Sequence, residues 1–592
     1  MTHLPTTRRE MLERGWEQLD IILLSGDAYV DHPSFGVAVI ARVLEAEGYR
    51  VWVIPQPSWH GDLRDFRRLG RPRLFFGVSP GAMDSMVNKY TAARRLRSQD
   101  AYSPDGRHDM RPDMPTIVYT DCVRRIFPDV PVVLGGVEAS LRRLAHYDYW
   151  KESLRPSLLA QTDADLIIWG MGERPIAELA RRLSDAVESY HPALFYDETG
   201  EAHVTRSVFA DVAHGIPQTA WLSGQKPDDC VEIASYEDCL ADPKCEASSI
   251  RVIEEESNAL TPRRIAQRTG SQWVVCEGQY SPMTTEELDA VYDLPYTRLP
   301  HPKYNGHRIP AYEMIRHSIT MHRGCFGGCA FCTISAHQGK FISSRSKRSI
   351  LAEAEAITHM PDFAGTISDL GGPSANMYRM AGADKSRCAR CRRPSCLHPS
   401  VCPNLHVDHS PLTEIYREVS AIKGVKHCYV GSGVRYDLIL HRNADESLNH
   451  ASADYARQLI LHHVSGRLKV APEHTEPSVL SLMRKPPFEQ FAQFKHLFDR
   501  ICNAEGKCQQ LIPYFISSHP GCYERDMESL ARKTRDMGYR LEQVQDFTPT
   551  PMTIATEMWA TGFDPYTLKP VFSAKSDEEK QRQRQYFFWW KN

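Results

Sequence analysis

The sequence has no uninterrupted apolar run close to the length of a membrane-spanning helix. Its N-terminal stretch, MTHLPTTRREMLERGWEQLD, also lacks the apolar core and the small-residue cleavage site of a secretory signal. The sequence thus shows neither the feature of an integral membrane protein nor that of an exported one. We therefore expect a cytoplasmic protein with no membrane partner.

An excess of charge of either sign is also missing, because 71 lysines and arginines face 74 aspartates and glutamates, for a net charge of -3. Without a general positive field, the charge gives no support for a nucleic-acid partner, although it leaves room for a local basic patch. With 42% hydrophobic and 24% charged residues, the composition is that of a globular protein. A length of 592 residues predicts two or three domains.

Cysteine is plentiful, with 16 residues, and in a reducing compartment these are not expected to form disulfides. Clustered cysteines then indicate metal binding or redox chemistry, whereas scattered ones are interpreted as small buried residues. The scattered set is Cys122, Cys230, Cys239, Cys245, Cys276, Cys428, Cys502, Cys508 and Cys522.

Short apolar runs that end in glycine turns alternate with amphipathic stretches over residues 1–224. This alternation predicts an α/β domain with a doubly wound parallel sheet. Ligands of such sheets bind at the carboxyl ends of the strands, so turns such as 27–36 and 77–81 are the candidate rim. Residues 225–305, which are richer in proline, acidic and aromatic residues, are interpreted as a connecting subdomain.

Regular alternation returns after residue 305, with six strand–helix units that reach to about residue 560. Six units in a row predict a parallel α/β barrel or part of one, which is interrupted by a cysteine-rich insertion at 380–410. Residues 561–592 form a C-terminal tail, whose aromatic residues we expect to pack on the barrel.

Three cysteines, Cys325, Cys329 and Cys332, lie in one loop after the first predicted barrel strand, in the stretch HRGCFGGCAFCTIS. A structural zinc site uses four ligands, usually in two separated pairs, whereas this loop supplies three thiols. An iron–sulfur cluster held by three thiolates would keep one iron open for another ligand. The intervening glycines allow the backbone to wrap closely around a bulky inorganic group.

The spacing Cys325-x-x-x-Cys329-x-x-Cys332, with Phe331 before the last cysteine, resembles the motif of the radical S-adenosylmethionine (SAM) superfamily. The resemblance implies that the three cysteines hold a [4Fe-4S] cluster whose fourth iron binds SAM. An electron from the cluster then cleaves SAM to a 5'-deoxyadenosyl radical, which abstracts hydrogen from a substrate. Phe331 would lie near the adenine of SAM.

Later stretches also resemble elements of that superfamily. With SGDAYVDHPSFG, VVLGGVEASLRR and DLGGPSANMY, the chain is similar over nearly its whole length to the YgiQ-type radical SAM family. In DLGGPSANMY, Gly371 and Gly372 would meet the SAM amino group. In VGSGVRYD, Ser432 would bind a ribose hydroxyl and Arg435 a carboxylate. Glu473 of KVAPEHT would project into the site. Further candidates are Asp369, Asn376 and His474.

A second group of cysteines, Cys388, Cys391, Cys396 and Cys402, lies in the insertion CARCRRPSCLHPSVC. Four thiols within so short a stretch of a cytosolic protein predict a second metal site. With zinc it would be a four-coordinate structural site, and with an iron–sulfur cluster it would relay electrons. Both remain open, and we favour the iron–sulfur cluster slightly.

The first domain is similar to the cobalamin-binding module of one radical SAM branch. In the base-off version of that module, an Asp-x-His-x-x-Gly motif supplies histidine to cobalt. Here Asp31 directly precedes His32, and three residues separate His32 from Gly36, so the motif is broken. Some relatives bind cobalamin without that histidine, so the fold by itself neither grants nor excludes this cofactor, and we favour a substrate-docking surface.

The sequence thus predicts a radical SAM enzyme with an unknown substrate and an electron donor such as flavodoxin or ferredoxin. Methylthiolation or another modification of tRNA or protein would fit the branch that the barrel resembles. The alternative is a non-catalytic binding module in which both cysteine groups are structural.

Overall fold

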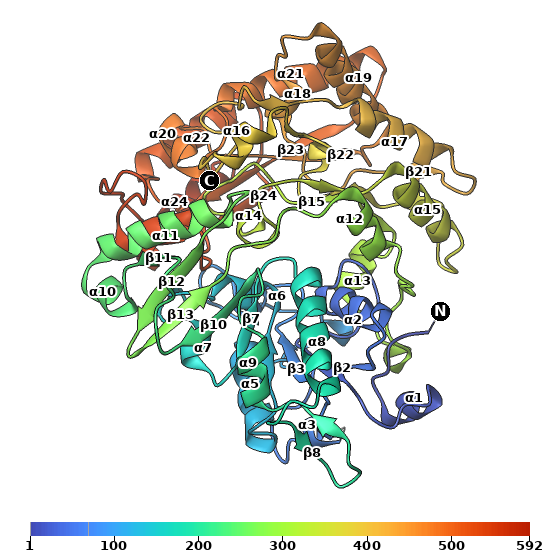
Figure 1. Ribbon diagram of the computed structural model, residues 1–592. Coiled ribbons are helices and arrows are strands. Elements are labelled where there is room, and N and C mark those ends of the chain that lie inside the picture. Colours follow the sequence, from blue (N-terminus) through green and yellow to red (C-terminus); the bar gives the residue numbers. More distant parts are fainter. Residues whose placement is uncertain (1, 69, 592) are drawn as a thin grey trace. The chain divides into compact units, whose positions relative to one another are not determined.

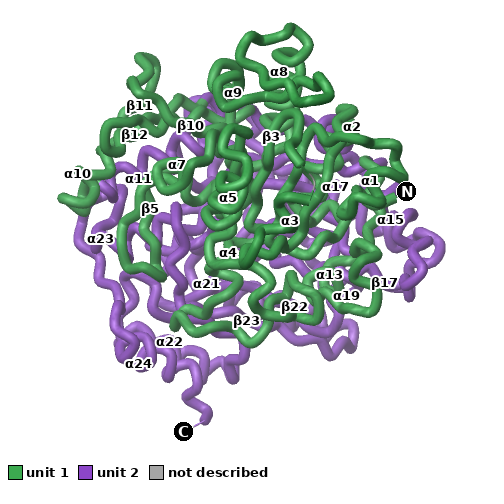
Figure 2. Tube along the Cα trace, turned by 90° about the horizontal axis from the view of Figure 1, so that it is seen from below, with its two compact units in different colours: residues 1–245, 262–280, 294–316 green, residues 246–261, 281–293, 317–592 purple. Residues whose placement is uncertain are grey.

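The computed structural model describes residues 2–68 and 70–591, and the chain divides into two compact units (Figures 1 and 2). The first unit comprises residues 1–245, 262–280 and 294–316, and the second comprises 246–261, 281–293 and 317–592. The helix α11 (Pro243–Ser257) crosses a boundary between these segments. No helix among the described residues is both long and apolar enough to cross a membrane.

The first unit is built on one nine-stranded sheet with the order β11-β12-β13-β10-β7-β4-β3-β1-β2. In chain order the strands are β1 (Ile21–Ser25), β2 (Val51–Pro55), β3 (Phe75–Ser79), β4 (Val132–Leu134), β7 (Leu166–Ile168), β10 (Thr219–Ser223), β11 (Cys230–Ile233), β12 (Arg264–Thr269) and β13 (Gln272–Cys276). The first five of these pair in parallel. Strands β10, β13 and β12 pair antiparallel in succession, so the sheet is mixed.

The α/β class and the parallel part of the predicted sheet are confirmed, because each predicted run of the first domain forms a strand. All five residues of β1 and of β2 are buried, as a parallel strand covered on both faces must be. Helices α2 (Gly36–Ala46) and α8 (Glu173–Glu188) pack on each other beside these strands. Their buried residues recur every three or four positions, which is the spacing of one helix face.

The remaining helices of the first unit are shorter. They are α1 (Arg8–Glu13), α3 (Arg64–Arg67), α4 (Ser85–Lys89), α5 (Pro115–Ile126), α6 (Gly136–Leu141), α7 (Leu158–Gln161), α9 (Arg206–Val212), α10 (Tyr236–Ala241) and α13 (Pro310–Ile315). Two small hairpins pair β5 (His146–Asp148) with β6 (Ser153–Arg155), and β8 (Phe195–Tyr196) with β9 (Ala202–His203).

The segment 225–305, which the sequence indicates as a connecting subdomain, contributes to both units. Its strands β11, β12 and β13 extend the sheet of the first unit. Its residues 246–261 and 281–293, which include α12 (Thr285–Tyr292), belong to the second unit. The antiparallel pairing of β10 with β13 joins residues about 50 positions apart, which no local pattern reports.

The second unit contains short parallel strands followed by helices. Strand β14 (Ser318–Thr320) pairs with β18 (Asp369–Gly371), β17 (Thr366–Ile367) with β21 (His427–Cys428), and β22 (Arg467–Glu473) with β23 (Gln510–Ser517) and then β24 (Gln543–Asp546). Every one of these pairs is parallel. Two antiparallel pairs, β15 (His322–Arg323) with β16 (Ser343–Ser344) and β19 (Ala381–Gly382) with β20 (Leu405–His406), flank the cysteine-bearing loops.

Helices follow the strands of the second unit, as the alternation in the sequence predicts. They are α14 (Ile334–Gln338), α15 (Lys347–Thr358), α16 (Lys385–Ala389), α17 (Ser410–Ala421), α18 (Tyr436–Ile439), α19 (Glu446–His462), α20 (Pro477–Met483), α21 (Phe488–Ala504), α22 (Glu524–Asp536), α23 (Ile554–Thr561) and α24 (Asp577–Gln585). In the predicted tail, Phe587 is fully buried.

Candidate functional site

The loop from Cys325 to Cys332 begins directly after β15 and is shaped by glycines. Gly324 and Gly328 have φ angles of +86° and +57°, a region that other residues rarely adopt. A Cβ atom on Gly324 would lie 2.1 Å from the carbonyl oxygen of Phe341. The Cys332 N–H donates to the carbonyl of Cys329 over 3.1 Å, which closes a turn between the last two cysteines.

Backbone groups from two later helices hold this loop. The Ala330 N–H donates to the carbonyl of Met483 at the end of α20 over 3.1 Å. The carbonyl of Ala330 accepts from the N–H of Ala555 in α23 over 2.9 Å. Arg484 also donates from Nη1 to the carbonyl of Gly328, over 3.4 Å. Contacts from several segments therefore fix the loop that carries the three thiols.

The three cysteines are free thiols, and each is partly buried. Burial raises the pKa of Cys325 to about 11, and the neighbouring Cys329 adds to the effect. Burial also raises the pKa of Cys332 to about 12, with further contributions from Cys329 and Cys325. Burial and the neighbouring thiols thus oppose ionisation of Cys325 and Cys332, so a metal group that binds thiolates here would displace protons. Within the described residues, no three His, Cys, Asp or Glu side chains are arranged to hold a single metal ion.

Arg435, predicted to bind a carboxylate, is paired with a carboxylate of its own chain. Its Nε and Nη2 donate to the two oxygens of Asp437 over 2.9 and 2.5 Å. Its remaining nitrogen, Nη1, lies 3.7 Å from Sγ of Cys329. Asn376 fixes the Arg435 backbone, since its Oδ1 accepts from the Arg435 N–H over 2.7 Å and its Nδ2 donates to the Arg435 carbonyl. The structure therefore places a positive charge beside the cysteine loop, and a role of Arg435 toward a cofactor stays a prediction.

Gly371 and Gly372, at the end of β18, lie against neighbouring side chains. A Cβ atom on Gly371 would lie 2.2 Å from Oγ of Ser432, and one on Gly372 would lie 2.4 Å from Cε1 of His322. The Ser432 hydroxyl donates to Asp369 over 2.5 Å, and burial raises the pKa of that aspartate. The structure thus brings both glycines and Ser432 together, at a place where only glycine fits.

Glu473 ends β22 with a φ angle of +68°, a conformation that costs free energy for a residue with a side chain. Its carboxylate is buried and lies 3.5 Å from the ammonium group of Lys485. Burial raises the pKa of Glu473, whereas the charge of Lys485 opposes the rise. Lys485 was not predicted as a site residue, because nothing in the surrounding LMRKPPF marks it.

Phe331 lies among the aromatic side chains of the last two strand ends. Its ring centroid is 6.0 Å from that of His519, which in turn is 5.3 Å from Phe547. His519 is fully buried, and burial lowers its pKa to about 4, so its ring is neutral at physiological pH. The signal that could have identified His519 is its place in SSHPG, directly after β23.

The four cysteines of the insertion are also free thiols, and three of them act electrostatically on the fourth, Cys396. Burial raises the pKa of Cys396 to about 11; the charge of Lys340 opposes this rise, and the other three thiols add to it. The predicted second cysteine group is thus brought together, and its ligation of a metal stays a prediction.

Comparison with known proteins identifies the family. A UPF0313 protein of Bacteroides thetaiotaomicron is 60% identical and covers 99% of this chain and 94% of its own. The UPF0313 protein YgiQ of Escherichia coli is 43% identical over 98% of this chain and 82% of its own. The chain belongs to the UPF0313 family. In addition, the family model described as Radical SAM N-terminal matches residues 3–318, which places the chain in the radical SAM superfamily.

Among solved structures, this UPF0313 protein is similar to the radical S-adenosylmethionine methyltransferase TsrM from Kitasatospora setae with cobalamin and a [4Fe-4S] cluster bound. That likeness has a TM-score of 0.46 and 15% sequence identity, and covers 90% of this chain and 77% of TsrM. A second similar structure, the cobalamin-dependent S-adenosylmethionine radical enzyme OxsB, has a TM-score of 0.44.

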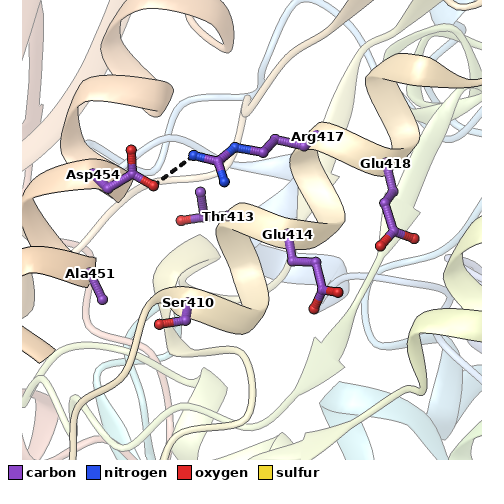
Figure 3. Close-up of a pocket in the computed structure, with 7 residues that line it drawn as sticks. All are labelled: Ser410, Thr413, Glu414, Arg417, Glu418, Ala451 and Asp454. Carbon is purple, nitrogen blue, oxygen red and sulfur yellow. Dashed lines mark hydrogen bonds and ion pairs between the residues drawn. The ribbon is translucent and has the colours of Figure 1, made fainter. Parts of the chain in front are cut away.

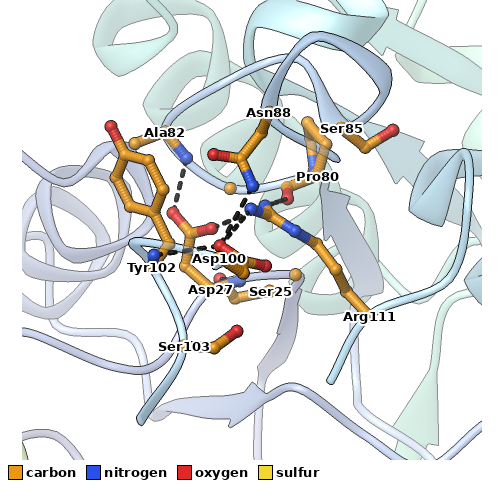
Figure 4. A network of polar contacts seen from close by, with 12 residues as sticks. Ser25, Asp27, Pro80, Ala82, Ser85, Asn88, Asp100, Tyr102, Ser103 and Arg111 are labelled. Atoms are coloured by element: carbon orange, nitrogen blue, oxygen red, sulfur yellow. Dashed lines mark hydrogen bonds and ion pairs between the residues drawn. The ribbon is translucent and has the colours of Figure 1, made fainter. Parts of the chain in front are cut away.

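In the first unit of this UPF0313 protein, the parallel strands follow the order β2-β1-β3-β4-β7, so the strand order reverses between β1 and β3. Ligands of such folds bind at this switch point. Here Arg111 occupies it, donating to Asp27 over 2.8 Å, to the carbonyl of Pro80 over 3.1 Å and to Asp100 over 2.9 Å (Figure 4). Arg111 is only 2% exposed. Burial raises the pKa of Asp27 to about 6, against the opposing charge of Arg111.

His32, the histidine of the broken motif, is buried in the same unit, and its Nδ1 accepts from the N–H of Ser34 over 3.0 Å. Its neighbour Asp31 pairs with Arg42 through both oxygens, at 3.0 and 2.5 Å. The side chains at the switch point and beside His32 thus bond mainly within the chain, and the absence of a cobalamin site stays a prediction.

A pocket of about 460 Å³ lies on the second unit between α17 and α19 (Figure 3). Its wall includes the ion pair between Arg417 and Asp454, at 2.8 Å. Glu414 and Glu418 both bind Lys347, at 2.8 Å each. The lining contains none of the cysteines or predicted site residues, and its charges pair within the chain, so the candidate site remains the cysteine loop.

Proposed function

We propose that this chain is a radical SAM enzyme in which Cys325, Cys329 and Cys332 hold a [4Fe-4S] cluster. The observation that carries the proposal is one glycine-shaped loop that presents three free, partly buried thiols and is pinned by backbone contacts from α20 and α23. When bound, the cluster would supply the electron that cleaves SAM to a 5'-deoxyadenosyl radical. Membership in the UPF0313 family and the radical SAM superfamily supports the proposal.

The strands of the second unit would form a partial (β/α)6 barrel around this loop. The pairs β14–β18, β17–β21 and β22–β23–β24 are all parallel, and a helix follows each of the six predicted units. Parallel barrels gather chemistry at the loops after their strands. The position of Arg435, Glu473 and Phe331 at or beside such loops supports their place in the cofactor site.

Each of these residues would have a separate task. Gly371 and Gly372 would let the backbone approach the SAM amino group, and Ser432 would lie beside the ribose. Arg435 would offset the negative charge of the cluster thiolates, since its Nη1 is already near Sγ of Cys329. Phe331 would cover the adenine, and Glu473 would accept a hydrogen bond from the cofactor or substrate. The substrate would supply the hydrogen atom that the radical abstracts.

We further propose that the electron comes from a small donor such as flavodoxin or ferredoxin, and that the protein works in a reducing cytoplasm. The second point is supported by the sixteen cysteines, all of which are free thiols. The first unit would act without cobalamin and would dock the substrate, because Arg111 and its aspartates fill the switch point.

The test is purification and reconstitution with iron and sulfide without air, followed by reduction in the presence of SAM. We expect about four irons bound to the loop thiols and the release of 5'-deoxyadenosine and methionine. Replacing the exposed Cys508 by alanine should leave both results unchanged. Reconstituted protein that binds iron but releases no 5'-deoxyadenosine, with or without candidate substrates, would contradict the proposal and favour a structural metal site.

A further inference from the structure

We propose that Cys388, Cys391, Cys396 and Cys402 bind a second metal centre that braces the backbone of the first cysteine loop. The shared chemistry is ligation by four thiolates. Since no described side chains are arranged around a single ion, the proposal favours an iron–sulfur cluster, with zinc as the other outcome of the test. The proposal rests on the proposed function only in taking the first loop as a cluster site. The existence of the second centre can be tested without any SAM chemistry.

Backbone hydrogen bonds join the four cysteines in two pairs. The Cys391 N–H donates to the carbonyl of Cys388 over 3.1 Å, which makes a tight turn between the first two. The Cys402 N–H donates to the carbonyl of Cys396 over 2.7 Å, which joins the other two across five intervening residues. The gap of two residues between Cys388 and Cys391 is typical of thiolate metal sites.

Two of the sulfurs already accept hydrogen bonds. The backbone N–H of Arg393 donates to Sγ of Cys391 over 3.4 Å, and Nδ2 of Asn404 donates to Sγ of Cys388 over 3.3 Å. Donors of this kind orient metal-binding thiolates and stabilise their negative charge. Neither sulfur is part of a disulfide. The arrangement therefore supports metal ligation better than simple packing.

Most of the insertion has no regular secondary structure to stabilise it. Residues 390–404, all of which are described, contain neither helix nor strand. A short irregular segment gains little from a hydrophobic core of its own, so the free energy of metal binding can fix its conformation. The segment 385–389 before it is a single short helix, α16.

The same segment lies directly against the first loop. The Cys396 N–H donates to the carbonyl of Phe326 over 2.9 Å, and Oγ of Ser395 donates to the carbonyl of Gly327 over 2.7 Å. A Cβ atom on Gly328 would lie 2.4 Å from the carbonyl oxygen of Pro394. These contacts fall on the three residues between Cys325 and Cys329. The insertion thus sets the path of the backbone that spaces two of the first three thiols.

Apolar packing joins the two cysteine groups further. Phe326 from the first loop and Leu397 from the insertion belong to one buried cluster. Cys325, Cys396 and Cys402 pack against that cluster. Lys340 adds a polar contact, because its ammonium group donates to the carbonyl of Arg393 over 2.6 Å.

The physical consequence is coupling between the two centres. A metal that fixes residues 388–402 also fixes the Pro394–Cys396 backbone, and with it the hydrogen bonds to Phe326 and Gly327. Removal of that metal should free the first loop and raise the rate at which its cluster is lost. Because such coupling is reciprocal, loss of the first cluster should also weaken metal binding at the second centre.

The existence of the second centre is tested in a chain that lacks Cys325, Cys329 and Cys332, each replaced by alanine. After purification without air, we expect this variant to retain either one zinc or about four irons with sulfide. Elemental analysis and Mössbauer spectra distinguish the two outcomes. A variant with native circular dichroism that takes up no metal, even when reconstituted with excess zinc or with iron and sulfide, would overturn the proposal. The proposed function would stand if the intact chain still cleaved SAM.

The brace is tested with Cys388→Ser/Cys391→Ser, because these two cysteines make none of the contacts with the first loop that are described above. Iron release from the first loop to a chelator should become at least tenfold faster than in the unaltered chain. Ser395→Ala, which keeps all four thiols but removes one contact with Gly327, should retain the second metal and give a smaller acceleration. Cys508→Ser is the matched control. An unchanged release rate in a folded Cys388→Ser/Cys391→Ser variant that has lost its second metal would overturn the brace.

Discussion

The cysteine loop of the second unit and the switch point of the first unit occupy comparable positions, since each follows a strand of an α/β unit. At the switch point, the charge of Arg111 is met by Asp27 and Asp100 of the same chain. In the cysteine loop, three thiols come together without a disulfide. Arg435 pairs with Asp437 through two of its nitrogens, and its third nitrogen lies beside Sγ of Cys329. A binding site can therefore form at either strand end. Whether it binds a ligand depends on whether its side chains already pair with one another.

The largest effect that this comparison predicts is the response to Cys329→Ala. Without one of three thiolates, the loop should lose its cluster, and reductive cleavage of SAM should fall by at least about 100-fold. The measurement is iron content together with 5'-deoxyadenosine release under dithionite. Cys508→Ala, at an exposed cysteine, is the control. If the Cys329→Ala protein cleaves SAM as fast as the unaltered chain, the loop is not the reactive site.

At the switch point, Arg111→Met should destabilise the protein without touching the cysteine loop. The substitution leaves Asp27 and Asp100 buried without their partner, which costs about 3–5 kcal/mol of unfolding free energy. Urea denaturation of the full-length chain measures this loss, and the triple variant Arg111→Met/Asp27→Asn/Asp100→Asn should recover much of it.

The matched control for Arg111→Met is Arg9→Met, which removes one partner of an exposed ion pair with Glu13. Surface pairs contribute little, so urea denaturation should show no measurable change. Equal losses from Arg111→Met and Arg9→Met would mean that the switch-point network does not stabilise the fold.

A smaller effect concerns pH, because the second unit buries several neutral histidines. Burial lowers the pKa of His322, His409 and His519 to about 4. Between about pH 6.5 and pH 4 the unfolded chain binds protons that the native histidines do not, so stability falls as pH falls through this window. At pH 5.5 each such histidine lowers the unfolding free energy by about 1.4 kcal/mol relative to pH 7.5.

Denaturation of the protein at pH 7.5 and 5.5, at constant ionic strength, checks this expectation. His409→Gln removes one of the titrating rings, which stacks on Tyr455 in the native state. The loss of stability between the two pH values should be smaller in this variant than in the unaltered chain. If the two losses are the same, His409 is not neutral in the folded protein.

The smallest predicted effect concerns the electrostatics of the loop. The double variant Arg435→Gln/Asp437→Asn removes the charged donor near Sγ of Cys329 while leaving no buried charge unpaired. Hydrogen bonds to cluster sulfurs raise the reduction potential, so the variant should titrate at a potential lower by about 60 mV, or a tenfold change for one electron.

Electron paramagnetic resonance during a redox titration measures that potential. Arg417→Gln/Asp454→Asn removes an exposed ion pair of the same kind and is the matched control (Figure 3). A shift of equal size in both double variants would show that the effect does not come from the contact between Arg435 and Cys329.

Several features were accessible from the sequence because they depend on local patterns. The run IILLS and its successors predicted the parallel strands β1, β2, β3, β4 and β7. The strands β11–β13 were not recognised as part of the same sheet, because proline and acidic residues interrupt their apolar pattern and their pairing is non-local. Lys485 and Asp437 were missed as neighbours of Glu473 and Arg435, since neither belongs to a recognisable motif.

The sequence by itself determined the alternation of strands and helices, the family, and the spacing of the three thiols, because each of these is written in residues close together along the chain. Only the tertiary structure decided that the second cysteine group packs against the first loop, and that Arg111 closes the switch point beside Asp27. Periodicity reports which face of an element is buried. Which distant side chains then meet depends on how the whole chain folds.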